Sequence, residues 1–452
     1  PPPSPPVKLS FPHPLVLLVL FALLAAGASY VLPAGEFDRR DDAETGRKVV
    51  VSGTYHRVQQ QPVGAFDAVV AIPRGAADAA SVIFFVFLVG GAFAVVEQTG
   101  ALTRAVNWLV HRLQSRETLV IPIACIAFGA AGALMQMAEE LLAFVPVLLL
   151  LTRRLGFNPL TAVAMSMGAA AVGAAFSPID PFMVGIAQKV AGLPLLSGAA
   201  FRMIFLLAAV AFWIAATMRY AQRTRTEPEV TALGDAEAID ARRAIVLLLV
   251  LATFVLFVVG VMRFGWGFDE LAALFFLMGV AAGLIGGLRV NGTAEAFVEG
   301  FRSMAFAAMI IGFARAIYLI LEQGRIIDTI VHGLFVPIQG LPPVLSAIGM
   351  MFAQVLIHFP VPSTSGQAVL TLPVLVPLSD LIGLSRQVTV LAYQYGAGLC
   401  ELVTPTNGAL MAMLAATRVP YVEWLRFFSW RGAALAALSI IAIITAIAIG
   451  LQ

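Results

Sequence analysis

Long runs of apolar residues constrain this chain more than any other feature. A helix needs about 20 apolar residues to cross the hydrocarbon core of a bilayer, and several runs approach that length. These runs are residues 15–32, 80–97, 201–218, 244–262, 270–288, 302–320 and 431–450. Charged residues make up only 12% of the chain and hydrophobic ones 60%, against about 25% charged in a soluble domain. We therefore expect lipid to surround much of the protein.

Composition argues against nucleic-acid binding and against a disulfide framework. The formal net charge is only +2, whereas a phosphate-binding face needs clustered Lys and Arg. Cys125 and Cys400 are far apart in apolar surroundings and are expected to be packing residues. The run 15–32 is too long for the apolar part of a signal peptide, so we expect it to be the first transmembrane helix.

The hydrophilic segments predict how the chain is oriented in a bacterial inner membrane. Residues 219–243 contain five arginines, so the positive-inside rule puts them in the cytoplasm as a linker, together with residues 1–14. The amphipathic segment 104–116 fits the same interface. Residues 33–78 have mixed charge and valine-rich stretches and are expected to form an extracytoplasmic insertion with a small β-hairpin. The C-terminus is then extracytoplasmic.

The two halves of the chain share matched positions. Pro146 and Pro373 lie 227 residues apart, and the same offset relates SPID at 177–180 to TPTN at 404–407. Matched breaks of this kind are hard to obtain by chance in apolar sequence, so we expect an internal repeat. The helices of the first repeat and the connecting helix together cross the membrane an odd number of times. The second repeat therefore starts on the opposite side of the membrane from the first, which predicts that it is inverted.

The predicted fold is an all-α polytopic membrane protein made of two inverted repeats, each with a re-entrant hairpin and a broken transmembrane helix. The expected parts are a first repeat at 15–218 with a hairpin at 118–151 and a broken helix at 158–190, a connecting helix at 244–262, and a second repeat at 263–452 with a hairpin at 344–378 and a broken helix at 387–416.

The breaks in the first repeat are acidic. The first hairpin tip reads GALMQMAEE at 132–140 and contains Glu139 and Glu140, of which helix geometry predicts that only one faces a site. The break SPIDP at 177–181 contains Ser177 and Asp180, and its prolines free carbonyls that can ligate a cation. Ionisable residues within a membrane are functional candidates, although solvated glutamates at the interface and an ordinary loop are the alternatives.

The breaks in the second repeat are neutral and rich in hydroxyl groups. The second hairpin tip reads PVPSTSGQ at 360–367 and the second broken helix contains TPTNG at 404–408. Hydroxyl and amide donors of this kind suit a carboxylate. The candidate residues are Ser363, Thr364, Ser365, Gly366, Gln367, Thr404, Thr406 and Asn407. Glu401, which precedes the last break, is a candidate for proton coupling or for a helix-packing hydrogen bond.

Motifs for catalysis are absent from the sequence. The five histidines form no His-x-x-x-His pair, and the chain contains neither a Gly-x-Ser-x-Gly elbow nor a phosphate-binding loop. We expect no enzyme activity and no cofactor. The competing hypothesis from another class is a membrane receptor or scaffold that does not transport.

Several stretches resemble the YfcC-type branch of the anaerobic C4-dicarboxylate carrier (DcuC-like) family, and the resemblance covers nearly the whole chain. They are LPAGEF at 32–37, VGGAF at 89–93, residues 132–140, PFMVGIAQ at 181–188, STSGQAVL at 363–370, YGAG at 395–398 and TPTNGALMAM at 404–413. The resemblance implies a homodimer with a scaffold domain and a mobile transport domain that works as an elevator. It departs at Asp180, where the family usually has Asn.

The substrate stays open between two classes within this family, whose annotated substrates include C4-dicarboxylates and basic amino acids. An acidic half-site, with Glu139, Glu140 and Asp180, opposite a hydroxyl-rich half-site favours an amino acid, with basic ones such as arginine or ornithine among the candidates. The alternative is a C4-dicarboxylate coupled to Na⁺ or H⁺. The residues expected to hold such a cation are Ser177, Asp180, Glu139, Thr404 and Asn407.

Overall fold

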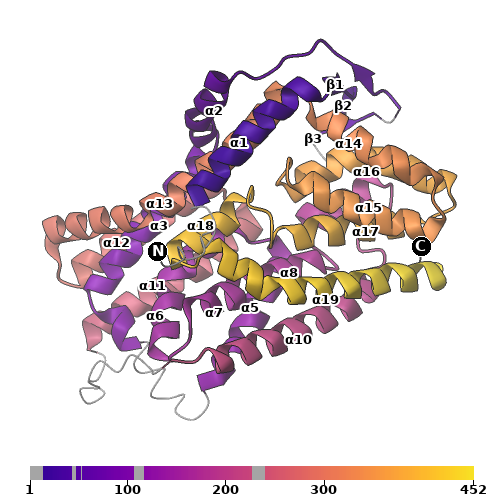
Figure 1. Cartoon of the computed structure of the whole chain (residues 1–452). Coiled ribbons are helices and arrows are strands. Elements are labelled where there is room, and N and C mark those ends of the chain that lie inside the picture. The colour runs from indigo at the N-terminus through magenta and orange to yellow at the C-terminus, as the bar shows by residue number, and fades with distance from the viewer. Residues whose placement is uncertain (1–13, 43–46, 52, 106–116, 227–239, 452) are drawn as a thin grey trace, which may run out of the picture.

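The computed structural model describes residues 14–42, 47–51, 53–105, 117–226 and 240–451, and this part of the chain is almost entirely helical (Figure 1). Helices are the expected outcome, because lipid cannot satisfy backbone N–H and C=O groups and a helix pairs them internally. The all-α prediction is thus confirmed for the bulk of the chain. Residues 1–13, most of the segment 104–116 and the middle of the linker 219–243 lie outside the described residues.

The first half contains nine described α-helices. They are α1 (Pro14–Val31), α2 (Ala65–Asp78), α3 (Ala80–Gln98), α5 (Val120–Met135), α6 (Val145–Arg154), α7 (Pro159–Val163), α8 (Ala169–Ala175), α9 (Ile186–Val190) and α10 (Ala199–Arg223). Short 3₁₀ turns precede α5 (Glu117–Leu119) and α6 (Glu139–Phe144), and π-helical turns precede α8 (Ala164–Gly168) and α9 (Pro181–Gly185).

The second half contains nine more. They are α11 (Ala241–Val259), α12 (Phe268–Ile285), α13 (Arg289–Gln323), α14 (Ile327–Phe335), α15 (Pro343–His358), α16 (Thr364–Leu381), α17 (Arg386–Cys400), α18 (Gly408–Thr417) and α19 (Tyr421–Ala448). A π-helical turn (Gly260–Phe264) extends α11, and a 3₁₀ turn (Val336–Gly340) follows α14.

Each segment predicted as a hairpin or a broken helix contains two or three α-helices. In the first half, the predicted hairpin at 118–151 contains α5 and α6, and the predicted broken helix at 158–190 contains α7, α8 and α9. In the second half, α15 and α16 correspond to the hairpin, and α17 and α18 to the interrupted helix. Each interrupted helix leads into a long helix, α10 or α19.

The hydrophilic segment 33–78 contains the expected β-structure and also a helix that its charge pattern did not predict. Strands β2 (Arg39–Asp42) and β3 (Arg47–Val50) form an antiparallel hairpin, and β1 (Gly35–Glu36) pairs with β4 (His56–Arg57). Residues 65–78 instead form α2, which packs against α13. The small residue Gly75 explains this contact, because an added Cβ there would lie 2.5 Å from the carbonyl oxygen of Gly312.

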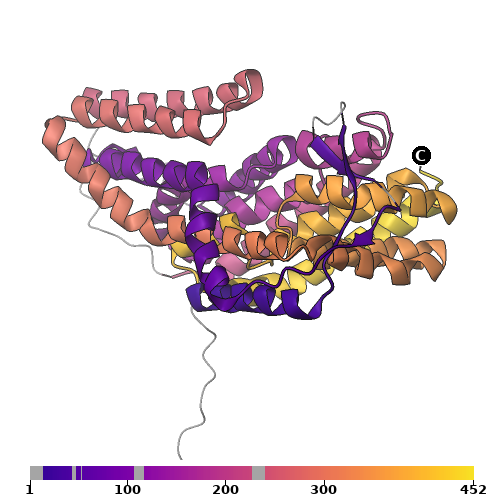
Figure 2. The ribbon, with the colours of Figure 1, turned by 90° about the horizontal axis from the view of Figure 1, so that it is seen from above.

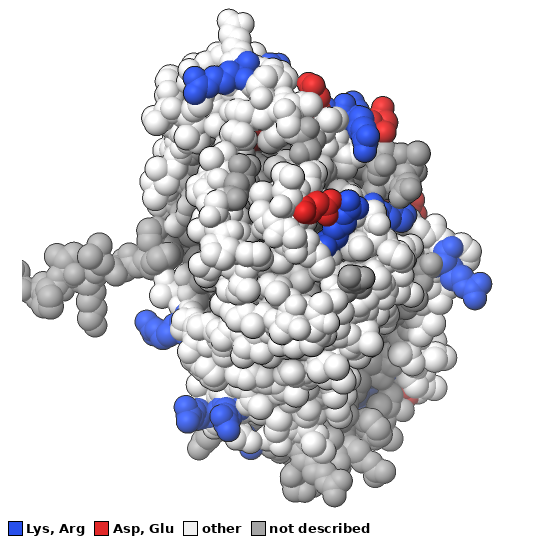
Figure 3. All heavy atoms as spheres, turned by 90° about the vertical axis from the view of Figure 1, so that its right-hand side faces the viewer, with Lys and Arg blue, Asp and Glu red and all other residues white. Residues whose placement is uncertain are grey.

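Five of the described helices are long and apolar enough to cross a membrane. They are α3, α10, α12, α13 and α19. The runs 15–32 and 244–262 are also helical, as α1 and α11, but do not belong to this set. Figure 3 shows one face of the molecule whose broad centre is mostly uncharged, with acidic side chains mainly in the upper part and basic ones there and along the edges. Such a surface suits contact with lipid.

Two groups of helices divide the molecule. In the first, α13 packs against α3 and α2, α12 packs against α3, and α11 lies beside α12 at the edge of the molecule (Figures 1 and 2). In the second, α5 packs against α8 and α15 packs against α17. Helix α18 contacts α13 and links the groups, and β3 of the insertion packs against α16.

Glycines allow α5 and α8 to approach closely. An added Cβ on Gly173 would lie 2.0 Å from the carbonyl oxygen of Gly129, and one on Gly132 would lie 2.0 Å from that of Ala170. These obstacles are backbone atoms, which cannot rotate away as a side chain can. Helix α5 therefore packs against α8 with their backbones in direct contact.

We expect Gly173→Ala to destabilise the protein by about 1–3 kcal/mol, because the added methyl group overpacks a backbone contact. A thermal unfolding curve in detergent should show a lower midpoint than the wild type. The matched control is Gly27→Ala in α1, where nothing lies within 4 Å of the added Cβ. Equal midpoints for the two variants would contradict the close approach of α5 and α8.

Candidate functional site

Both hairpin tips and both helix breaks contribute to one cavity of about 370 Å³. It lies where the two groups of helices meet, because α12 and α18 also line it. The lining residues are Gln136, Ala138, Glu139, Glu140, Phe182, Phe268, Pro362, Ser363, Thr364, Ser365, Glu401, Asn407 and Gly408. Segments more than 270 residues apart in the sequence, Gln136 and Gly408 among them, thus share one polar cavity.

The two hairpin tips contact each other directly. Gln136 ends α5 in the left-handed region, with φ of 50°, a conformation that few residues other than glycine adopt. Its side-chain amide donates a hydrogen bond to Thr364 Oγ1, at the start of α16. The tip of the first hairpin therefore closes against the tip of the second.

Glu139 and Glu140 both line the cavity, so the expectation that only one would face it is wrong. The reason is local backbone geometry, since these residues begin a 3₁₀ turn at the tip rather than continue an α-helix. Glu140 Oε2 accepts a hydrogen bond from the backbone N–H of Ala138 at 3.1 Å. The carboxylate pair is thereby fixed to the end of the first hairpin.

The tip of the second hairpin presents hydroxyl groups and a helix N-terminus. Ser363 is the N-cap of α16, and its Oγ accepts from the backbone N–H of Gly366 at 3.3 Å. Thr364 and Ser365 follow it and also line the cavity. Tyr393 OH donates to the carbonyl oxygen of Thr364 at 2.7 Å, which ties the tip to α17.

Asn407 organises the second break. Its Oδ1 accepts from the backbone N–H of Leu410 at 3.1 Å and so caps α18. Its Nδ2 donates to the backbone carbonyl of Glu401 at 3.2 Å and to the Glu401 carboxylate. Two threonines of the second break, Thr404 and Thr406, are buried beside Asn407 and do not line the cavity. Thr406 Oγ1 donates a hydrogen bond to the carbonyl oxygen of Phe359 at 2.8 Å, which holds the break against the second hairpin.

Ser177 and Asp180, the candidates from the first break, are buried and do not line the cavity. Asp180 Oδ1 accepts from the backbone N–H groups of Phe182 and Met183, at 2.8 and 3.2 Å, and caps the turn that leads to α9. Ser177 Oγ donates to the carbonyl oxygen of Ala133 at 2.6 Å. Both residues hold the first hairpin and the break together. The five residues expected to share a cation therefore do not share one site.

The remaining predicted residues, Gly366 and Gln367, lie behind the tip. Gln367 is buried and hydrogen-bonded to His358 and Gln354, and Gly366 faces a second cavity described below. Sequence reasoning did not single out Gln136, Phe182 or Phe268. Gln136 was a polar residue within a tip already marked as unusual, whereas no local signal points to Phe268.

The cavity is electrostatically one-sided. Glu139, Glu140 and Glu401 line it, and no residue of its described lining is a lysine or an arginine. Helix ends add to this pattern, because the C-terminus of α5 is next to the first tip while the N-termini of α16 and α18 border the second half-site. A helix N-terminus favours an anion and a C-terminus favours a cation. The cavity therefore suits a ligand with a positive group at one end and a carboxylate at the other.

A buried arginine connects the two interrupted helices. Gln394 of α17 donates from Nε2 to the carbonyl oxygen of Ser177 at 2.7 Å. Its Oε1 accepts from Arg202 Nε at 3.0 Å, and Arg202 Nη2 donates to Gln387 Oε1 at 3.0 Å. Arg202 is fully buried on α10. The first break, α10 and α17 therefore form one hydrogen-bonded unit.

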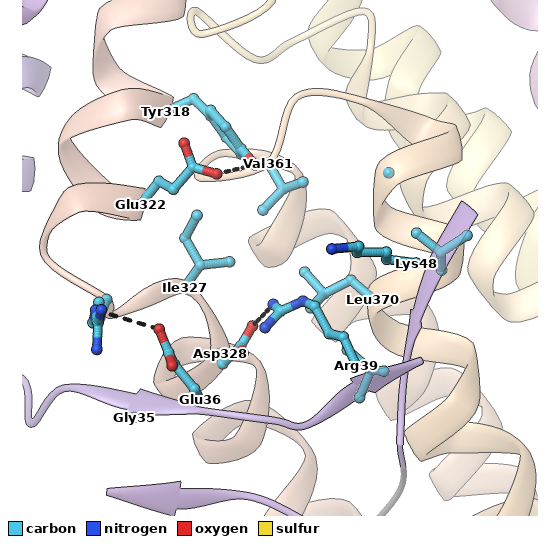
Figure 4. A pocket seen from close by; sticks show the side chains of 14 residues that line it. Gly35, Glu36, Arg39, Lys48, Tyr318, Glu322, Ile327, Asp328, Val361 and Leu370 are labelled. Atoms are coloured by element: carbon cyan, nitrogen blue, oxygen red, sulfur yellow. Dashed lines mark hydrogen bonds and ion pairs between the residues drawn. The ribbon is translucent and has the colours of Figure 1, made fainter. Parts of the chain in front are cut away.

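The second cavity, of about 430 Å³, lies between the extramembrane insertion, α13, α14 and the second hairpin (Figure 4). Asp328 of α14 accepts from the backbone N–H of Phe37 at 2.9 Å and from Arg39 Nη2 at 2.8 Å. Figure 4 also shows Glu36 paired with an arginine, which is Arg325 at 3.4 Å. These contacts fasten the insertion to α14 and to the turn that precedes it.

Within the residues that the structure describes, no group of three or more His, Cys, Asp or Glu side chains is placed to hold a metal ion.

Comparisons with known proteins cover nearly the whole chain. The family profile described as DcuC, C4-dicarboxylate anaerobic carrier, matches residues 11–448. YfcC of Escherichia coli (strain K12), whose name provisionally assigns it basic amino acid antiport, is 32% identical across 93% of this chain and 93% of the relative. An uncharacterized protein of Haemophilus influenzae is 28% identical across 93% of this chain and 94% of that protein.

Two solved structures superpose on most of the chain at low similarity. The YdaH transporter of Alcanivorax borkumensis aligns with a TM-score of 0.44 and 17% identity, over 97% of this chain and 99% of that one. MtrF of Neisseria gonorrhoeae aligns with a TM-score of 0.40 and 17% identity, over 96% of this chain and 95% of that one.

We expect Asp328→Ala to loosen the insertion, because it leaves the buried N–H of Phe37 without an acceptor, at a cost of about 1–3 kcal/mol. Limited trypsin digestion should cleave the segment 39–57 faster than in the wild type. Asp328→Asn keeps an oxygen acceptor and should show a smaller effect. The control Glu299→Ala breaks an exposed ion pair with Arg302, which contributes about 0–1 kcal/mol. Unchanged digestion of Asp328→Ala would refute the fastening role.

Proposed function

The chain belongs to the DcuC family of C4-dicarboxylate anaerobic carriers, and from that premise we propose that it is a secondary transporter or exchanger of a small carboxylate-bearing metabolite, with an amino acid as the favoured substrate. Membership makes it a multi-pass membrane transporter and not an enzyme. The cavity that both hairpin tips line supports the proposed substrate and mechanism.

The charge of the cavity supports an amino acid. A substrate carboxylate can accept hydrogen bonds from Ser363, Thr364 and Ser365 near the N-terminus of α16. A substrate amine can be bound by Glu139 and Glu140 on the opposite tip. Charge-assisted hydrogen bonds of this kind are roughly twice as strong as neutral ones, so both ends of the substrate would be recognised.

A basic amino acid fits better than a neutral one. Three carboxylates line the cavity and none of its described lining residues is a cation, so a ligand with net positive charge compensates more of the buried negative charge. The name of the E. coli relative, which refers to basic amino acid antiport, points to the same class. Arginine and ornithine are therefore the first compounds to test.

The alternative is a C4-dicarboxylate, which the description of the family favours. Glu139, Glu140 and Glu401 would repel the two carboxylates of such a substrate, unless protons or Na⁺ ions neutralised the acidic half-site. This hypothesis thus requires cation coupling, whereas exchange of basic amino acids does not.

We propose an elevator mechanism in a homodimer, with inverted repeats as its structural basis. The hairpins and interrupted helices would form the moving unit, joined internally by Arg202 and Gln394. Helices α1, α2, α3, α11, α12 and α13 would form the scaffold. The exposed apolar side chains of α11, among them Leu248 and Leu251, leave a surface for lipid or a second copy. The N-terminus would be cytoplasmic and the C-terminus extracytoplasmic.

Uptake of labelled arginine, ornithine and succinate into proteoliposomes, with and without Na⁺ and pH gradients, tests the substrate. In the double variant Glu139→Gln/Glu140→Gln, the KM for arginine should rise by about tenfold or more, because a hydrogen bond to a charged group contributes about 1.5–3 kcal/mol. The KM for succinate should not rise.

The control is Glu97→Gln, at the exposed end of α3 and outside the cavity, which should transport as the wild type does. A rise in the KM for succinate in the double variant, with the KM for arginine unchanged, would favour the dicarboxylate. Folded protein that moves none of these compounds would refute the proposed substrate class and favour the receptor or scaffold hypothesis.

A further inference from the structure

A fully buried histidine lies behind the wall of the cavity. His358 ends α15, and its two ring nitrogens face different partners. Nδ1 lies 2.9 Å from Gln367 Oε1, and Nε2 lies 3.5 Å from Oε1 of Glu401, which lines the cavity. Nε2 has no hydrogen bond within the described part of the chain. The question is therefore where the protons of this group reside.

Backbone carbonyl groups fix the direction of the hydrogen bonds to His358. Gln367 Nε2 donates to the backbone carbonyl oxygen of Gln354 at 2.7 Å and to Gln354 Oε1 at 2.5 Å. Rotating the Gln367 amide by 180° would bring its oxygen against that carbonyl, two acceptors facing each other. Gln367 must therefore present Oε1 to His358, and Nδ1 must be the donor.

The next residues in the network support the same assignment. Gln354 Nε2 donates to Thr371 Oγ1 at 2.8 Å, and the Thr371 hydroxyl donates to the backbone carbonyl of Gln367 at 2.8 Å. Each donor therefore has an acceptor, and the network begins and ends on backbone carbonyl oxygens. The neutral form of His358 carries its hydrogen on Nδ1.

This assignment leaves one proton to be placed. With hydrogen on Nδ1, Nε2 of neutral His358 is an acceptor, and it faces Glu401, whose ionised carboxylate is also an acceptor. Asn407 Nδ2 donates to Oε2 of the same carboxylate, so the oxygen nearest His358 is Oε1. Two acceptors in this position repel each other, unless a proton on either group lies between them.

We propose that His358 and Glu401 together hold one exchangeable proton, and that this proton competes with the positive group of the substrate. The second clause rests on the transport function proposed above. When the pair is protonated, it carries one negative charge fewer, and Glu139 and Glu140 alone attract a cation. When the cationic substrate enters, it compensates the Glu401 carboxylate, and the proton leaves through Glu401 to the water of the cavity. Proton and substrate then move in opposite directions.

Other titratable groups on the neighbouring elements are engaged elsewhere. On α14, Asp328 binds Arg39 and His332 stacks on Tyr55. On α16 and α17, Asp380 pairs with Arg386. On α17, the Tyr393 OH donates to Thr364 and the Cys400 Sγ donates to Val355, whereas Tyr395 packs on Phe176 and its OH has no hydrogen bond within the described residues. On α19, the Tyr421 OH donates to Val403, Arg431 donates to the carbonyl oxygen of Phe427, and Glu423 and Arg426 line a different cavity. Across the cavity, Glu139 and Glu140 are the charged groups that face the pair.

The first test reads the proton directly and needs no substrate. Solid-state NMR of protein with ¹⁵N-labelled histidine in liposomes distinguishes the two neutral tautomers and the imidazolium. The His358 signals are those lost in His358→Gln or, if that variant does not fold, in His358→Asn. We expect the Nδ1–H tautomer or the imidazolium, in proportions that change in Glu401→Gln. The Nε2–H tautomer, or proportions that are the same in Glu401→Gln as in the wild type, would overturn the proton site.

The second test measures whether proton movement is coupled to substrate transport. A pH-sensitive dye inside proteoliposomes should report alkalinisation when external arginine enters, and this signal should be lost in Glu401→Gln. Arginine uptake by the wild type without a pH change would overturn the competition. Succinate entry with acidification would also overturn it, while retaining the proton site. Absence of any flux would refute the proposed function alone, because the NMR test still decides whether the pair holds a proton.

Discussion

The need to satisfy backbone polar groups inside the bilayer governs the architecture of this protein. An interrupted helix frees N–H and C=O groups that lipid cannot pair, and three of the four interruptions here are capped by a polar side chain from the break itself. Asp180 serves the first interrupted helix, Ser363 the second hairpin and Asn407 the second interrupted helix. These caps stabilise three helix starts in an apolar environment, and two of them, those of Ser363 and Asn407, lie at the cavity.

The same requirement explains how far the sequence could be interpreted. Polar residues within apolar runs pointed to seven of the residues that line the cavity, because such residues are costly in a membrane. The sequence does not distinguish a cap from a ligand, since Ser, Asn and Asp serve equally well in either role. Asp180 was therefore expected in the site and caps a helical turn outside the cavity, and Ser177 was expected there too and bonds to backbone groups. Phe268, and the His358 network, depend on contacts between distant segments that no local pattern reveals.

The two tips that form the cavity differ in charge. The first tip has Glu139 and Glu140 at the end of α5, whereas the second has hydroxyl groups at the start of α16. A hydrogen bond from Gln136 joins them. The packing of the helices thus sets the position of the cavity, and the residues at the tips set its polarity.

The contact between β3 and α16 has a mechanical consequence. The insertion is anchored to α14 through Asp328 and also packs on α16, so it is a tether between these two helices. If the second hairpin moves as we propose, this tether would limit how far it can travel before the strand detaches. Changes in the length or anchoring of the insertion would then alter turnover without altering any residue that lines the cavity, and a ligand bound to the insertion would slow transport without entering the cavity.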